Sequence, residues 1–127
     1  MKIPVLETTT EKYFFQYITI INPIILKLSP MQLKVLGAIL YYNYQYKDHP
    51  TDLRDKLLFS TSTKKLIREY LKDDKGESFG EGNFNNIIKE LRKKGIIKGK
   101  NNEQIINPIY CITPEKDLQL NINWKIK

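Results

Sequence analysis

The stretch Gly80–Ile97, GEGNFNNIIKELRKKGII, predicts a short amphipathic helix that leads into a strand. Helix spacing puts four apolar residues of the stretch on one face: Phe84, Ile87, Ile88 and Leu91. Gly95 then occupies the position after the last turn where helices favour a left-handed glycine. Ile96 and Ile97 follow as the start of a strand, so we expect the helix to begin near Glu81 and to end before Gly95.

A basic cluster spans the end of this helix and the residues after it. Between Lys89 and Lys100 there is one acid, Glu90, and there are six basic residues: Lys89, Arg92, Lys93, Lys94, Lys98 and Lys100. Lysines suit the negative end of the helix dipole, which accounts for Arg92–Lys94. The dipole does not account for Lys98 and Lys100, because both follow the helix.

The composition is that of one soluble domain of 127 residues, with 41% hydrophobic and 28% charged residues. The net charge of +7 favours acidic partners, nucleic acid first, although A/T-rich codons also raise the lysine content. A single cysteine, Cys111, excludes an intrachain disulfide and fits a reducing compartment. Because no signal-peptide pattern or membrane span is present, we expect a cytoplasmic protein.

The N-terminal half predicts several helices. Thr8–Asn22 favours a helix capped by Thr10 and ended before Pro23, although its β-branched and aromatic content is also typical of a strand. Ser29–Gln45 is the clearest helix, with the capping box Ser29-x-x-Gln32 and Pro30 in the first position. Its apolar stripe comprises Leu33, Leu36, Ile39 and Leu40, widened by Val35. Tyrosines crowd its end at positions 41, 42, 44 and 46; such residues either stack on bases or, more commonly, cover a small core.

Two shorter helices and a loop follow. Thr51–Phe59 predicts a helix capped by Thr51. Lys64–Lys72 predicts the next helix, with Leu66, Ile67, Tyr70 and Leu71 inward. Asp73–Gly80 is a polar loop.

The C-terminal part predicts strands. Ile96-Ile97 and Ile105-Ile106 flank the polar turn Lys98–Gln104 as a hairpin. Leu118–Ile126 alternates strictly between apolar and polar residues, which predicts a strand with one buried face.

This order of elements resembles the winged helix-turn-helix class. TKKLIREYL (Thr63–Leu71) and NFNNIIKELRKKGII (Asn83–Ile97) resemble a positioning helix and a recognition helix followed by a hairpin wing. LSPMQLKVLGAIL is similar to the first helix of the class, and the connection Lys72–Gly82 is longer than in its simplest members. The expected fold is therefore α+β, mainly α: a winged core over residues 29–107, an N-terminal arm or helix over 1–28 and a C-terminal extension with a strand over 108–127. The small size and A/T-rich signature are compatible with a phage or mobile-element protein.

The resemblance implies that the recognition helix enters the major groove of double-stranded DNA. Its outward residues would be Asn83, Asn85, Asn86, Lys89 and Lys93. Asparagine pairs with adenine and lysine reaches guanine or phosphate, but asparagine is also common in this chain and Asn83 suits an N-cap. Phosphate contacts would come from Lys64 and Lys65 on the positioning helix and from Lys98 and Lys100 on the wing.

Acids at the start of the recognition helix, Glu81 and Glu77, suit the helix dipole but repel phosphate. They leave open an alternative, a winged-helix module whose partner is a protein. A homodimer is expected for a DNA reader, since two half-sites multiply specificity.

The sequence gives no catalytic or cofactor constellation. The one histidine, His49, precedes a proline in a loop, and Cys111 lies in an apolar run. One His and one Cys do not make a usual zinc site, and GESFGEG lacks the lysine of a P-loop. We therefore expect no enzyme activity, no metal and no cofactor.

Overall fold

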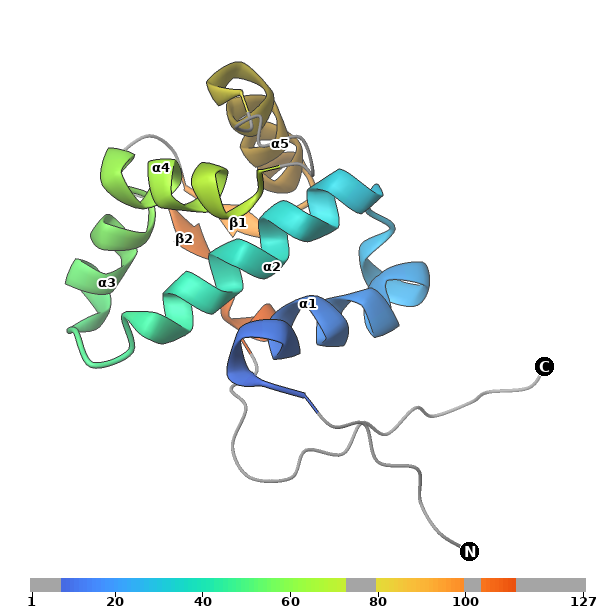
Figure 1. The fold of residues 1–127 in the computed structure, drawn as a ribbon, viewed down its shortest axis with the longest axis horizontal. Helices are drawn as coiled ribbons and strands as arrows, with labels where there is room; N and C mark the ends of the chain where they lie inside the picture. Colours follow the sequence, from blue (N-terminus) through green and yellow to red (C-terminus); the bar gives the residue numbers. More distant parts are fainter. Residues whose placement is uncertain (1–7, 73–79, 100–103, 112–127) are drawn as a thin grey trace, which may run out of the picture.

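The computed structural model describes residues 8–72, 80–99 and 104–111, and these residues form a mainly helical structure with one small antiparallel sheet (Figure 1). This confirms the coarse prediction of a mainly α member of the α+β class. The elements in chain order are α1 (Thr10–Ile21), the π-helix η1 (Asn22–Leu26), α2 (Pro30–Gln45), α3 (Thr51–Leu58), α4 (Thr61–Tyr70), α5 (Glu81–Lys93), β1 (Ile97–Lys98), β2 (Ile105–Ile106) and the 3-10 turn η3 (Pro108–Tyr110).

Helix α2 runs through the middle of the molecule, with α1 on one side of it and α3 and α4 on the other (Figure 1). Its predicted apolar stripe is buried in full, from Leu33 to Leu40. The predicted capping box at its start is confirmed: the Gln32 backbone N–H donates to Ser29 Oγ at 3.3 Å, and the Ser29 backbone N–H donates to Gln32 Oε1 at 3.1 Å.

Residues 10–21 are helical, so the strand alternative for this segment is wrong. Phe14 and Ile18 of α1 are buried and belong to the same core as the α2 stripe, and this helical spacing outweighs the β-propensity of the segment. The cap is Thr9 rather than the predicted Thr10, because the Thr9 side chain accepts from the Lys12 backbone N–H.

The predicted end of this helix before Pro23 is confirmed, because α1 ends at Ile21 with Asn22 as its C-cap. Proline has no N–H to continue the α pattern, and the chain widens into η1 instead of stopping. The Lys27 backbone N–H closes η1 by donating to the Asn22 carbonyl at 2.7 Å. Lys27 itself is left-handed, with φ of 53°, and this turn directs the chain into α2.

The first short helix begins at Thr51 as predicted but has another cap, and the second begins earlier than predicted. Pro50, not Thr51, is the N-cap of α3, with no side-chain capping bond. Helix α4 begins at Thr61, because the Ser60 side chain accepts from the Thr63 backbone N–H at 3.2 Å. The residues of α4 that face inward also differ in part from the prediction, as described below.

The end of α5 forms the predicted glycine stop. The Ile96 backbone N–H donates to the Leu91 carbonyl and the Gly95 backbone N–H to the Arg92 carbonyl, both at 3.1 Å, which is the Schellman pattern. Gly95 has φ of 77°, the left-handed conformation that favours glycine.

The predicted hairpin follows, with Ile97 opposite Ile106 and Lys98 opposite Ile105. The Asn107 side chain donates to the Gly95 carbonyl at 3.2 Å and joins the exit of the hairpin to the helix stop. The predicted strand Leu118–Ile126 and the residues Lys100 and Glu77 lie outside the described residues.

Candidate nucleic-acid interface

One face of α5 is buried and the opposite face is exposed. Phe84, Ile88 and Leu91 are buried against α2 and the hairpin, and Ile87 is half-buried beside them. The α-helical rotation of about 100° per residue places Asn86, Lys89 and Lys93 on the line opposite these apolar residues. All three are exposed.

Asn83 and Asn85, also exposed, lie on the two borders of this polar face. Gly80 is the N-cap of α5, so the suggestion that Asn83 is the N-cap is wrong. Asn83, Asn85 and Asn86 therefore have no capping role in α5. Asparagine lowers helix propensity, and no described contact of these three side chains offsets that cost. The face defined by residues 83, 85, 86, 89 and 93 is called the α5 polar face below.

The basic residues at the end of α5 make different contacts. Lys94 Nζ donates to the Lys27 carbonyl at 2.8 Å, which ties the end of α5 to the left-handed turn before α2. Lys93 lies 3.5 Å from the Glu90 carboxylate in an exposed i,i+3 pair. Arg92 is half-buried, and its Nε has no hydrogen-bond partner among the described atoms.

The remaining members of the cluster among the described residues are Lys89 and Lys98. Both are exposed, and neither forms an ion pair with an acid in the part of the chain that the structure describes. Lys98 lies on β1 next to Gly99, whose φ of 86° begins the turn of the hairpin. These two side chains therefore supply the cluster's accessible positive charge together with Lys93.

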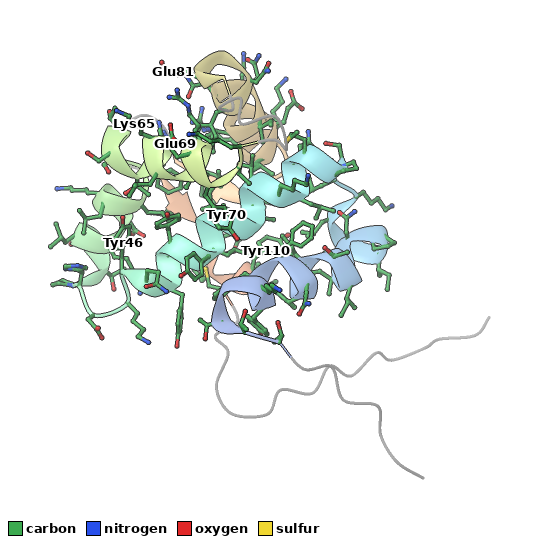
Figure 2. The ribbon with its side chains drawn as sticks, viewed as in Figure 1. Tyr46, Lys65, Glu69, Tyr70, Glu81 and Tyr110 are labelled. Carbon is green, nitrogen blue, oxygen red and sulfur yellow. The ribbon has the colours of Figure 1, made fainter. Side chains whose placement is uncertain are left out.

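Lys64 and Lys65 lie one turn into α4, which begins at the Ser60 cap. Lys65 is exposed and Lys64 is half-buried. Figure 2 shows Lys65 and Glu69 along the same side of α4, whereas Tyr70 lies on the side of α2. A hydrogen bond from Lys72 lowers the pKa of the Glu69 carboxyl, so this acid stays ionised beside the predicted phosphate contacts.

Glu81 is exposed in the first turn of α5 and lies at the far tip of that helix in Figure 2. A carboxylate there stabilises the positive end of the helix dipole. It also places a negative charge one turn from Asn85, beside the start of the α5 polar face.

Two residues of α4 differ from their predicted orientation. Leu66 and Tyr70 were expected inward, but each is 49% exposed. The inward residues are Thr63 and Ile67, because the Tyr46 hydroxyl is hydrogen bonded to Thr63 Oγ1 at 2.9 Å and fixes the rotation of α4 against the end of α2. No pattern in the sequence signals this bond between residues 17 positions apart.

The other candidate reactive groups are placed as follows. The four tyrosines at positions 41, 42, 44 and 46 are half-buried and pack around the end of α2, as the core interpretation predicts. His49 is exposed. Burial raises the pKa of the half-buried Cys111 thiol, which disfavours the nucleophilic thiolate.

Within the described ranges, no group of three or more His, Cys, Asp and Glu side chains is arranged to hold a metal ion, and no helix has the length and apolarity to cross a membrane.

No family model matches the chain, and neither the curated proteins nor the solved structures contain a match.

Proposed function

We propose that the protein binds double-stranded DNA as a winged-helix protein, with α5 in the major groove and the β1–β2 hairpin as the wing. The observation that carries the proposal is the α5 polar face, an exposed line of asparagine and lysine opposite the buried residues Phe84, Ile88 and Leu91. A helix of 13 residues is about 20 Å long, and its width suits the major groove of B-form DNA.

The chemistry of this face supports base contact in its first half and phosphate contact in its second. Asn85 and Asn86 carry amides of the kind that pair with adenine N6 and N7. Lys89 and Lys93 lie one and two turns further on and reach guanine or phosphate. The exposed pair of Lys93 with Glu90 is weak and breaks at low cost when a phosphate competes for the lysine.

Further phosphate contacts are assigned to Lys64 and Lys65 on α4 and to Lys98 on β1, with Lys100 as the remaining wing contact predicted from the sequence. If the five described lysines each neutralise one phosphate, the logarithm of the affinity falls with the logarithm of the salt concentration at a slope of about −4.5. A second copy of the chain would double this value by binding a second half-site.

A test of the proposal measures fluorescence anisotropy of labelled random duplex DNA across about 50–300 mM salt. The double variant Lys89→Glu/Lys93→Glu is compared with Lys47→Glu/Lys56→Glu, which makes the same charge change on exposed residues of another part of the surface. We expect steep salt dependence for the wild type, loss of binding in the α5 variant and near wild-type slopes in the control. Equal losses in both variants would show attraction by net charge alone and would contradict a site on α5.

A second candidate function, a winged-helix module that binds a protein, is favoured by one observation. Leu66 and Tyr70 lie one turn apart on α4 with half of each side chain exposed, and exposed apolar pairs of this kind are typical of protein contacts. Under this candidate the wild type does not bind duplex DNA even at the lowest salt, and the Leu66→Ser variant loses the partner.

A further inference from the structure

A groove of about 630 Å³ lies between α1, α2 and the end of α4, away from the α5 polar face. Three aromatic side chains line it: Phe15 from α1, Tyr41 from α2 and Tyr70 from α4. Phe15 is 40% exposed and Tyr70 is 49% exposed, so two of the three rings are open to solvent. Figure 2 shows Tyr70 between α4 and α2, where the groove lies.

Small residues of α2 form part of the groove lining. Gly37 and Ala38 are buried there and carry at most a methyl group. A Cβ added to Gly37 would lie 3.2 Å from the Phe15 Cα, so the glycine allows α1 to approach α2 closely at this point. The core residues on either side, Leu36 and Ile39, have large side chains. Gly37 therefore serves the close packing of α1 on α2, and Ala38 contributes only a methyl group to the groove lining.

The groove is positively charged. Lys12, Lys34 and Lys72 line it, and no carboxylate does so among the described residues. Lys72 is paired with Glu69 at 2.6 Å. Lys12 and Lys34 have no ion pair with an acid in the described part of the chain, so their charges are available to a ligand.

We propose that this groove binds a small aromatic anion, with its ring system among Phe15, Tyr41 and Tyr70 and its anionic group near Lys12 and Lys34. The volume lies in the range of about 300–1,000 Å³ that is common for small-molecule sites. Aromatic side chains favour aromatic ligands through offset and edge-to-face contacts. The lysines then select an anion over a neutral molecule of the same shape, because charge complementarity sets specificity at such a site.

This site shares no lining residue with the α5 polar face, and the inference does not rest on DNA binding. A ligand in the groove contacts α2 and the end of α4 together, and it would thereby hold α4 against the centre of the molecule. The ligand class follows from the groove alone: a planar aromatic body that carries a carboxylate, a sulfonate or a phosphate.

The test uses anilinonaphthalene sulfonate, an aromatic anion whose fluorescence rises in an apolar site, titrated against the folded full-length chain. N-phenylnaphthylamine, which lacks the sulfonate, is the neutral probe. The variant Lys12→Gln/Lys34→Gln removes the two available charges, and Lys47→Gln/Lys56→Gln removes two exposed charges elsewhere. Circular dichroism establishes that all variants are folded, because fluorescence of this probe also rises on partly unfolded chains.

We expect saturable binding of one sulfonate probe per chain, weakened about tenfold in the groove variant and unchanged in the control variant. The neutral probe should bind more weakly than the sulfonate and should not distinguish the variants. Displacement by naphthoate would show that a carboxylate serves as well as a sulfonate.

Equal affinities in the groove variant and the control would overturn the inference, as would binding that does not saturate. Displacement by oligothymidylate and not by naphthoate would assign the groove to single-stranded DNA and would likewise overturn a small-molecule site. The Lys89→Glu/Lys93→Glu variant keeps the groove intact, so retained probe binding in it separates failure of this inference from failure of the DNA proposal.

Discussion

Replacing Asn22 by alanine should destabilise the fold by about 2–3 kcal/mol, because its side-chain amide holds the turn between α1 and α2. Asn22 Nδ2 donates to the Leu28 carbonyl at 3.1 Å, and its Oδ1 accepts from the Leu28 backbone N–H at 2.7 Å. Leu28 is only 7% exposed, so water does not readily replace either bond. A buried backbone group left without a partner costs about 1–3 kcal/mol, and partial relaxation reduces the sum for two such groups.

The measurement is urea unfolding followed by circular dichroism, with the free energy of unfolding extrapolated to water. Lys27→Gly is the matched control in the same turn. It removes the strain of a left-handed lysine and keeps both Asn22 bonds, so it should leave stability unchanged or raise it by up to about 1 kcal/mol. A loss below about 0.5 kcal/mol for Asn22→Ala, at an unchanged denaturant slope, would refute the view that these two bonds hold the turn.

Three further substitutions test local features by the same unfolding measurement. Gly95→Ala should cost about 1–2 kcal/mol, because the left-handed φ of 77° strains alanine even though the added Cβ meets no atom within 4 Å; no loss would contradict the Schellman stop. Gly82→Ala should raise stability by up to about 1 kcal/mol, because alanine has a higher helix propensity than glycine and its Cβ would meet no atom within 4 Å. Weaker duplex binding by the same variant would indicate that DNA approaches this turn closely. Asp55→Asn should raise stability at neutral pH and leave it unchanged in acid. Burial raises the pKa of the Asp55 carboxyl in the folded state, so ionisation destabilises the wild type only at pH values above this pKa. A stability difference that persists at low pH would exclude this cause.

The DNA proposal and the groove inference assign different partners to different surfaces. Base and phosphate contacts are assigned to the polar residues opposite the buried line of α5, to α4 and to the hairpin. The groove is lined by α1, α2 and the last residues of α4. Because α4 takes part in both, a ligand in the groove that shifts α4 against α2 would change the placement of Lys64 and Lys65.

Local sequence signals determined the helices, the hairpin and the main stops. Ser29 with Gln32 specified the start of α2, and Gly95 specified the end of α5, because capping is a contact within one turn. Apolar spacing identified the buried line of α5 and thereby the polar face opposite it. The partner of this polar face stays a prediction, because asparagine and lysine suit a face exposed to solvent as well as a face that binds DNA.

Only the tertiary structure decided how the helices are rotated against one another and which contacts their charged residues make. The rotation of α4 depends on the bond between Tyr46 and Thr63, and this bond exposes Leu66 and Tyr70 against expectation. Lys94 is equivalent to its neighbours in sequence, yet it holds the Lys27 carbonyl, 67 positions away. The groove likewise combines residues of three helices. Periodicity and capping describe neighbours within one element, whereas these features depend on contacts between distant segments.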